Sequence, residues 1–278
     1  MNGFPKITIV TPTYNQAEFL PETLVSIEAQ NYPNLEHIIV DALSTDRTPE
    51  ITAEYAHRTG ARVIREGDRG QSDGINKGMR AATGDIVSWL NSDDTLEDGA
   101  LAAIARAFEQ NPTAVAICGV GSKMDRSGAL IRTVPFRPFE WRRLRTALEY
   151  IQPATYFRLE AWMKAGGLDE DLHYAMDWDL LIKLHRQGPI VPIPDRIARI
   201  RYYEDTKTST GGWKRAAEIA RIGRRHNGPL DLNNLSYVAR NLVAPVPLLR
   251  RAVDALFWKI GEHYPVMVCG WPERISGK

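Results

Sequence analysis

The sequence has few cysteines and no long apolar run. Cys118 and Cys269 are its only cysteines, and neither has a partner at metal-ligand spacing, so we expect free thiols in a reducing compartment. No stretch reaches the roughly 18 consecutive apolar residues of a membrane-spanning helix. The start MNGFPKITIV lacks the basic residues and apolar core of a secretory signal. We therefore expect a cytoplasmic protein that does not cross a membrane.

Two further features are missing, namely an excess of one charge and a glycine-rich phosphate loop. The net charge is +1, which argues against extensive nucleic-acid binding. Neither G-x-G-x-x-G nor G-x-x-x-x-G-K-[ST] occurs, so the sequence gives no case for a dinucleotide cofactor or a P-loop. The remaining composition, 44% hydrophobic and 25% charged, is that of an ordinary globular chain. It fits one α/β domain with an extension.

The first 110 residues alternate short β-branched runs with helical patterns. This alternation predicts a mostly parallel sheet flanked by helices. The predicted strands are 7–12, 35–41, 61–65 and 85–90, and the predicted helices are 17–30, one beginning at the hydroxyl cap Thr48, 71–82 and 96–109.

The second half has an α+β character. Its pattern predicts a strand at 115–119, a hairpin at 125–128, a helix at 138–150, a strand at 152–158, a helix at 177–187 and a strand at 197–203. We expect a main domain over residues 1–211, whose halves meet near residue 110, and a helical C-terminal extension over 212–278.

Polar residues follow three of the predicted parallel strands, where such sheets bind ligands. Asn91-Ser92-Asp93-Asp94 comes directly after the strand at 85–90, and one or two carboxylates there suffice for a hard divalent cation that shares substrate phosphates. An Asp-rich turn that caps the next helix explains the same residues equally well.

The loops after the first two strands suggest a nucleoside site. Asp41 is followed by a run of acceptors that includes Ser44, although turn and helix-cap chemistry is the better explanation for Ser44 alone. Thr11-Pro12-Thr13-Tyr14-Asn15 leaves the first strand through a rigid proline. Tyr14 can stack on a planar base there, or it can be core filler.

From about Lys6 to Thr208 the chain resembles family 2 glycosyltransferases with the GT-A fold. Three segments carry this resemblance, in order and at family spacing: ITIVTPTYNQAEFLPETLVSIEAQNYPNLEHIIVDALSTDRT, DRGQSDGINKGMRAATGDIVSWLNSDD and QPATYFRLEAWMKAGGLDEDLHYAMDWDLLIKL. The resemblance implies an inverting transfer of a sugar from a nucleoside diphosphate to an acceptor hydroxyl on a glycan or lipid-linked glycan. It makes 1–110 the nucleotide-sugar-binding half and 111–211 the acceptor-binding half.

The resemblance also implies residue roles. The nucleotide sugar, most often UDP-linked, would contact Thr11, Pro12, Tyr14, Asp41, Ser44, Asn76, Lys77, Asn91 and Ser92. Asp93, with Asp94 as a helper, would ligate Mg²⁺ or Mn²⁺. Asp177 lies at the family's catalytic-base position, and Asp179 is either an acceptor orienter or a helix-start charge. Both acids can also be ordinary favourable charges in the first turn of a helix.

Three positions depart from the family pattern. Asn91 replaces the usual first Asp of the D-x-D motif, Ala42 replaces a common Gly, and Tyr203 stands where many relatives have a metal-binding His. Ala42 is a small change, while Asn91 and Tyr203 keep open a sugar-binding module that has lost catalysis. A sugar nucleotidyltransferase fits less well, because the loop after the first strand lacks the Gly-rich, basic sequence of that class.

The stretch 213–278 has about twice as many basic as acidic residues. It combines Arg224-Arg225 and Arg250-Arg251 with apolar residues such as Trp258. Such a mixture suits peripheral contact with an anionic membrane on the inner face of the plasma membrane, while a helical cap on the main domain explains it somewhat better.

Overall fold

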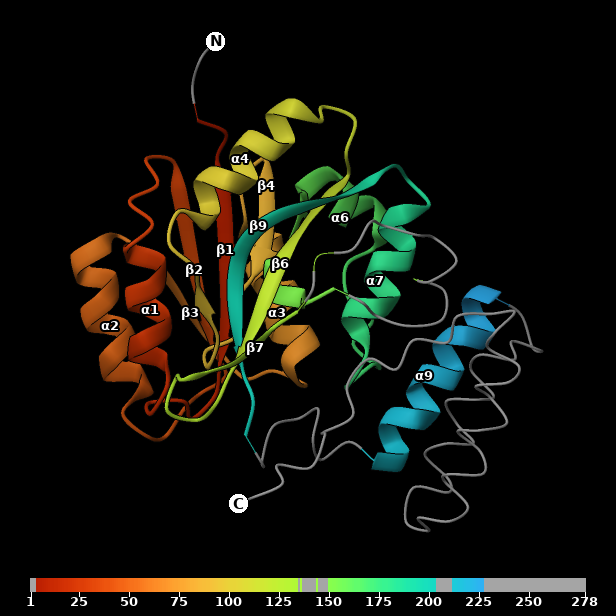
Figure 1. Cartoon of the computed structure of the whole chain (residues 1–278). Coiled ribbons are helices and arrows are strands. Elements are labelled where there is room, and N and C mark those ends of the chain that lie inside the picture. Colours follow the sequence, from red (N-terminus) through yellow and green to blue (C-terminus); the bar gives the residue numbers. More distant parts are fainter. Residues whose placement is uncertain (1–3, 135, 137–143, 145–149, 204–211, 228–278) are drawn as a thin grey trace, which may run out of the picture.

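The computed structural model describes residues 4–134, 136, 144, 150–203 and 212–227 (Figure 1). Its helices are α1 (Leu20–Glu28), α2 (Thr48–Thr59), α3 (Gln71–Ala81), α4 (Ala100–Gln110), the 3-10 turn η1 (Gln152–Ala154), α6 (Leu159–Ala165), α7 (Met176–His185) and α9 (Gly212–Asn227). Its strands are β1 (Ile7–Thr13), β2 (Leu35–Asp41), β3 (Arg62–Arg65), β4 (Ile86–Trp89), β5 (Thr95–Leu96), β6 (Ala116–Met124), β7 (Leu130–Thr133), β8 (Thr155–Arg158) and β9 (Ile190–Arg201). In the part of the chain so described, no helix has the length and apolar character that a membrane span requires.

The strands form one curled sheet in the order β3-β2-β1-β4-β8-β6-β9-β5, with β7 paired to β6. The neighbours from β3 to β4 are parallel, as the alternating pattern of the first 110 residues predicts. In the second half β8 is antiparallel to both β4 and β6, while β9 runs parallel to β6. The predicted α/β class is confirmed.

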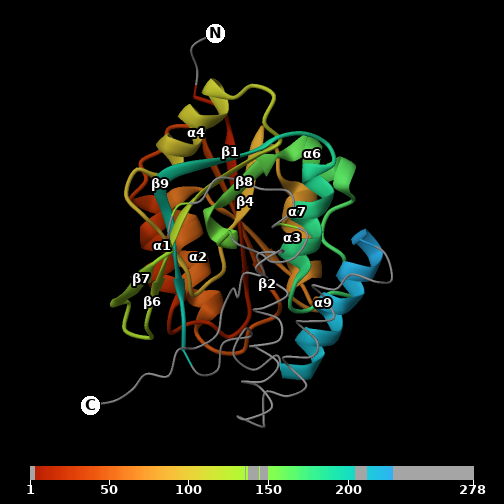
Figure 2. The same cartoon turned by 45° about the vertical axis from the view of Figure 1, so that its right-hand side comes forward.

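Helices cover both faces of the sheet. On one face, Val10 and Val40 pack against Ile75 of α3 in a core that also includes α6 and α7. On the other face, Ile7 and Ile9 pack against α4, and Ile39 packs against α1 and α2. Figure 2 shows this division, with α1, α2 and α4 on one side and α3, α6, α7 and α9 on the other.

The strand order reverses between β1 and β4. From β1 the chain proceeds outward to β2 and β3, and it then returns to β4 on the opposite side of β1. The register of β1 with β4 ends at Val10 and Trp89, whereas β1 stays paired with β2 as far as Thr13. The sheet therefore opens beyond Val10, which is the kind of switch point where α/β proteins bind ligands.

Several element boundaries differ from the sequence prediction. The helix predicted from Leu96 begins only at Ala100, because Thr95 and Leu96 form a short strand against β9. Thr48 does not cap α2, since the N-cap position is Arg47 and the Thr48 hydroxyl instead accepts from the Gln16 amide. The hairpin at 125–128 is present, while the helix predicted at 138–150 lies largely outside the described residues.

Candidate active site

The loops that follow β1 and β2 are tied together by hydrogen bonds. The Asn15 amide donates to Ser44 Oγ at 2.9 Å, and the Thr45 amide donates to Asn15 Oδ1 at 2.8 Å. Asn15 and Leu43 have φ angles of 50° and 62°, a region that is costly for leucine. Strained backbone held by such bonds clusters at ligand sites. The two loops therefore form a fixed rim at the carboxyl edge of the sheet.

Asp41 is fully buried at the end of β2, beneath this rim. Its Oδ1 accepts from the Ser44 amide at 2.9 Å, and its Oδ2 accepts from Arg65 Nε at 3.0 Å. Arg65 also donates to the Ser44 carbonyl, and half of its side chain is exposed. The sequence reasoning missed Arg65, although β2 and β3 are parallel and Asp41 lies directly beside it in the register.

The β1 candidates have different surroundings. Tyr14 is 58% exposed, so it is not core filler and its ring is accessible to a ligand. Thr11 is buried and its hydroxyl bonds to His37 Nε2, and Pro12 is also buried. The neighbouring Thr13 hydroxyl is buried without a hydrogen-bond partner among the described residues. An unpaired hydroxyl at the opening of the sheet adds a polar group that the sequence reasoning did not select.

On the other side of the opening, the segment after β4 places its two carboxylates differently. Asp94 points inward, where Oδ1 accepts from the Arg201 amide and Oδ2 from Asn91 Nδ2, both at 3.0 Å. Asp93 is partly exposed, and Tyr203 donates its hydroxyl to Asp93 Oδ2 at 3.3 Å. Asp93 is thus the carboxylate that a ligand can reach, while Asp94 fixes the turn. Ser92, which lies between Asn91 and Asp93 in the chain, is buried.

β9 and α3 complete this segment. Arg201 is almost completely buried, donates to the Asp93 carbonyl at 3.0 Å and pairs with Glu22. Gln71, at the start of α3, donates to Asn91 Oδ1 at 2.7 Å. Neither residue was selected from the sequence, because both belong to elements remote in the chain from Asp93.

Burial and charge repulsion act on the two carboxylates. Burial raises the pKa of Asp93 despite the hydrogen bond from Tyr203 and the positive charge of Arg201. Burial and the negative charge of Asp93 together raise the pKa of Asp94 well above its usual range. Burial and the same Asp93 charge raise the pKa of Tyr203 to about 12, so its hydroxyl stays protonated as a donor. A pair of acids in such surroundings favours an additional positive charge.

The donor set fits a divalent cation that is shared with a substrate. Across the described residues, no three His, Cys, Asp or Glu side chains gather as a protein-only metal cage. A hard cation such as Mg²⁺ or Mn²⁺ does not need one, because it commonly takes one or two carboxylates, water and substrate phosphates. Asp93 supplies one accessible carboxylate, and the Tyr203 hydroxyl donates to it.

Asn76 and Lys77, two predicted donor contacts on α3, have other partners. The Asn76 amide group donates to the Leu168 carbonyl at 2.9 Å and accepts from the Leu168 amide at 3.0 Å. Lys77 bonds to the Gly67 carbonyl and pairs with Glu66 and Asp73. Asn76 therefore holds the loop between α6 and α7 and is not among the groups tied to Asp41 or Asp93.

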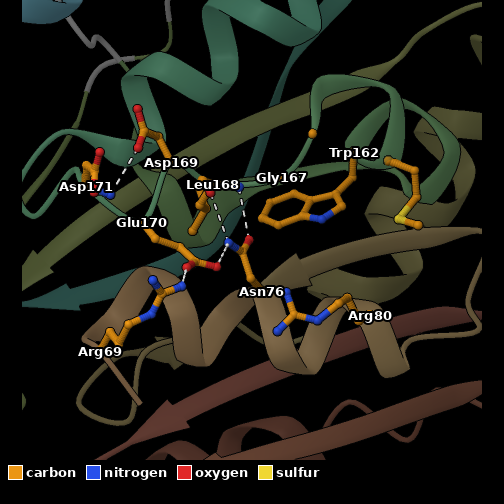
Figure 3. Close-up of a pocket in the computed structure, with 11 residues that line it drawn as sticks. Arg69, Asn76, Arg80, Trp162, Gly167, Leu168, Asp169, Glu170 and Asp171 are labelled. Atoms are coloured by element: carbon orange, nitrogen blue, oxygen red, sulfur yellow. Dashed lines mark hydrogen bonds and ion pairs between the residues drawn. The ribbon is translucent and has the colours of Figure 1, made fainter.

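A pocket of about 470 Å³ lies where this loop meets α3 and α6 (Figure 3). Asn76 and Arg80 from α3, Trp162 from α6 and the loop from Gly166 to Asp171 line it. Figure 3 shows Asn76 bonded to Leu168 and Glu170, and Arg69 paired with Glu170. The pocket and the polar groups at the sheet opening have no lining residue in common.

Asp177 and Asp179, the predicted catalytic pair, face in different directions. Both lie in the first turn of α7, and residues two apart on a helix point about 200° apart. Asp177 is partly exposed. Asp179 is fully buried and pairs with Lys183, Arg225 and His226. These contacts do not fit a role for Asp179 in orienting an acceptor.

The pKa of Asp179 agrees with these buried contacts. Burial raises it, but the hydrogen bonds from His226 and Lys183 outweigh burial and lower it to about 2. The carboxylate is thus held ionised by Lys183, Arg225 and the hydrogen bond from His226, and the last two contacts join α9 to α7. Within the described part of the C-terminal extension, Arg225 faces the main domain, while Arg250, Arg251 and Trp258 lie outside the described residues.

Known proteins that resemble the chain are glycosyltransferases. Residues 8–170 match the model of the family described as "Glycosyl transferase family 2". The chain is 33% identical over 187 residues to the O-antigen biosynthesis protein RfbC of Myxococcus xanthus, covering 65% of this chain and 14% of that protein. It is 30% identical over 194 residues to a PGL/p-HBAD biosynthesis glycosyltransferase of Mycobacterium bovis, covering 67% and 72%.

The chain is also 28% identical over 186 residues to the chondroitin synthase of Escherichia coli, covering 66% of this chain and 27% of that protein. It therefore spans only a small part of two of these relatives, RfbC and the chondroitin synthase.

Two solved structures share the fold. Staphylococcus aureus TarS 1-349 in complex with UDP-GlcNAc has a TM-score of 0.66 at 20% identity and covers 85% of this chain and 71% of that one. The mannosyltransferase PcManGT from Pyrobaculum calidifontis, in complex with GDP-Man and Mn²⁺, has a TM-score of 0.62 at 21% identity and covers 95% and 83%. The chain belongs to glycosyl transferase family 2, and its architecture is that of the GT-A glycosyltransferases.

Proposed function

We propose that the chain is an inverting, divalent-metal-dependent glycosyltransferase that moves a sugar from a nucleoside diphosphate to a hydroxyl of a glycan or lipid-linked glycan. One observation carries this proposal. The rim that holds Asp41 and the segment that exposes Asp93 flank the same opening of the sheet between β1 and β4. That arrangement suits a ligand with a base at one end and a diphosphate at the other.

For the nucleoside we propose uridine. Asp41 is fixed by Ser44 and Arg65 with an acceptor lone pair left on each oxygen, which suits the N–H of a pyrimidine ring. The exposed ring of Tyr14 is available for stacking on the base. TarS supports UDP, because it was solved with UDP-GlcNAc, whereas PcManGT holds GDP-Man. The donor panel described below decides between these bases.

For the diphosphate we propose Asp93 as the protein ligand of Mg²⁺ or Mn²⁺. The cation would neutralise the charge that develops on the leaving diphosphate. Tyr203 orients the Asp93 carboxylate through its hydroxyl, and Arg201 fixes the backbone carbonyl of the same residue. Asp94 takes no direct part in this proposal, because both of its oxygens are used by Arg201 and Asn91.

For the proton we propose Asp177 as the general base. The acceptor oxygen forms a bond to the anomeric carbon as the bond from that carbon to the diphosphate breaks on the opposite face. The configuration inverts, the diphosphate leaves with the electron pair, and the acceptor proton passes to Asp177. A positioned carboxylate in this role contributes about 10²–10⁴-fold to the rate. Its partial exposure in the first turn of α7 keeps it accessible.

A donor panel tests the proposal. The full chain is incubated with UDP-, GDP- and dTDP-sugars, with Mn²⁺, Mg²⁺ or EDTA, and the release of nucleoside diphosphate and the thermal shift are measured. We expect a metal-dependent response to a UDP-sugar, reduced in Asp93→Asn and retained in Asp98→Asn, a control at an exposed carboxylate. Release of pyrophosphate from a nucleoside triphosphate and a sugar phosphate would instead indicate a nucleotidyltransferase.

The departures at Asn91 and Tyr203 favour one other candidate, a non-catalytic sugar-nucleotide-binding module. The same panel separates it from an enzyme, because such a module would give a thermal shift with the donor and no nucleotide release. We retain peripheral contact with an anionic membrane on the cytoplasmic side as a proposal for the C-terminal extension, residues 212–278. Failure of the full chain to bind anionic vesicles at low salt would remove that part.

A further inference from the structure

A carboxylate on α9 binds the segment that leads into the candidate base. Glu218 Oε1 accepts from the amides of Tyr174 and Ala175 at 2.7 and 2.9 Å, and Glu218 Oε2 accepts from the amide of His173 at 2.9 Å. These three consecutive N–H groups come immediately before α7, whose first turn includes Asp177. One side chain from a remote helix therefore fixes the backbone at the entrance of α7.

This contact reaches the N-cap residue of α7. The first amides of a helix have no partner inside the helix, and a capping side chain or another acceptor must satisfy them. Ala175 occupies the N-cap of α7 and has no side-chain hydrogen bond to give. Glu218 accepts from the amide of this N-cap residue, and Asp177 Oδ1 accepts from the Trp178 amide inside the first turn at 2.9 Å. The negative charge of Glu218 is favourable at the positive end of the helix dipole.

Glu218 is itself held in place. Ile219 and Ile222 of α9 are buried in the core that includes α7, and Arg225 and His226 pair with the buried Asp179. These contacts fix α9, and with it the backbone of Glu218, against α7.

α3 holds the preceding part of the same segment. Ser72 Oγ donates to the Leu172 carbonyl at 3.0 Å, and Asn76 binds both backbone polar groups of Leu168 (Figure 3). α3 begins at Gln71, which donates to Asn91, two residues before Asp93. The segment 168–175 is thus held by two helices. α3 binds its first part and reaches the donor side of the site, and α9 binds its last part, just before α7 and Asp177.

We infer that Glu218 is a positioning residue for the transfer reaction and acts by orienting Asp177 toward the acceptor. The inference rests on the proposed role of Asp177 as base. α9 lies outside residues 8–170, the part of the chain that matches the family model. By this inference the C-terminal extension supports the candidate base, in addition to covering the main domain.

The test compares Glu218→Gln with Arg224→Gln in the full chain. Arg224 is an exposed residue of the same helix and serves as the matched control. We expect Glu218→Gln to lower kcat for nucleoside diphosphate release from the best donor of the panel by at least about tenfold, with the donor KM within about twofold of wild type. Hydrogen exchange should become faster at the amides of 173–175 in Glu218→Gln and stay unchanged in Arg224→Gln.

A double-mutant cycle separates positioning from general stability. If Glu218 acts through Asp177, the variant Asp177→Asn/Glu218→Gln should be no slower than Asp177→Asn alone. Two results would overturn the inference. One is a double variant in which the kcat losses of the two single variants multiply, and the other is a Glu218→Gln enzyme with kcat within about twofold of wild type. If Glu218→Gln does not fold, Glu218→Asp keeps the charge one methylene shorter and should show the same kcat loss at unchanged KM.

The outcome for Asp177→Asn distinguishes two failures. Activity of Asp177→Asn close to wild type would remove the proposed base and the inference together. A strong loss in Asp177→Asn with an unaffected Glu218→Gln would remove the inference alone and leave the proposed function standing.

Discussion

His37 on β2 should make the stability of the protein fall as the pH falls below about 6.5. Its ring is buried between two hydroxyls, with Nε2 at 2.9 Å from Thr11 Oγ1 and Nδ1 at 3.1 Å from Tyr55 OH. The neutral imidazole, with one donor and one acceptor, satisfies both hydroxyls. Burial lowers the pKa of His37 from 6.5 to about 3, so the folded protein keeps the ring neutral where the unfolded chain protonates it.

The magnitude follows from this difference in pKa. Between pH 6.5 and pH 3 the unfolded state binds more protons than the folded state, so the free energy of unfolding decreases as the pH falls. The difference between 6.5 and about 3 corresponds to about 5 kcal/mol, which is lost in full only below pH 3. About 2 kcal/mol of this is lost by pH 5. Above pH 6.5 the ring is neutral in both states and the contribution to pH dependence vanishes.

Urea unfolding at pH 7 and pH 5 measures this contribution. In His37→Gln the loss between the two pH values should be about 2 kcal/mol smaller than in wild type, because carboxylates titrate in both proteins and cancel in the comparison. Tyr55→Phe is the matched control, since it removes one hydrogen bond and retains the histidine. The Tyr55→Phe protein should be less stable at both pH values, and its free energy of unfolding should fall between pH 7 and pH 5 by the same amount as that of wild type. If His37→Gln lost as much free energy of unfolding between pH 7 and pH 5 as wild type, the assignment of this pH dependence to His37 would be refuted.

Three further predictions concern the candidate site and its support. Asp93→Asn should abolish the metal-dependent part of donor binding, measured by calorimetry with UDP and Mn²⁺, while binding measured in EDTA stays as in wild type. Asp177→Asn should lower kcat by about 10²–10⁴-fold with the donor KM little changed, measured by steady-state kinetics, and a loss of less than about tenfold would exclude it as the base. Gly78→Ala should destabilise the fold by about 1–3 kcal/mol in urea unfolding, because an added Cβ would lie 2.3 Å from Val10 Cγ1 and 3.1 Å from Val40 Cγ2. Adding Val10→Ala should recover part of that loss, and a Gly78→Ala protein as stable as wild type would contradict the packing described here.

The parallel half of the fold could be predicted because its pattern is local. Strands such as Ile7–Thr13 are buried along their whole length and are separated by amphipathic helices, so composition and period indicate the same element. The short strand Thr95–Leu96 could not be predicted this way. It exists only because β9 pairs with it from about a hundred residues away, and an isolated pair of residues has no period.

The candidate site could likewise be predicted from the sequence only where its pattern is local. Asp41 and Asp93 could be selected because each follows an apolar strand at the carboxyl edge of the sheet. The different surroundings of Asp177 and Asp179 depend on α9, whose Arg225 and His226 bind the buried Asp179, while Asp177 is partly exposed. The position of Asn76 against Leu168 likewise follows from how a loop packs on α3. Contacts between distant segments decided these roles.

β8 lies between β4 and β6, and this interleaving has a consequence for any attempt to divide the chain. A break near residue 110 would strip the first half of the partner that pairs with Ile86 and Val87 and of the β9 segment that pairs with Thr95 and Leu96. The separated piece would expose an unpaired edge beside the opening between β1 and β4, and such edges promote aggregation. The two halves of the main domain thus share one sheet, and swapping one half between relatives would require matching the strands of the other.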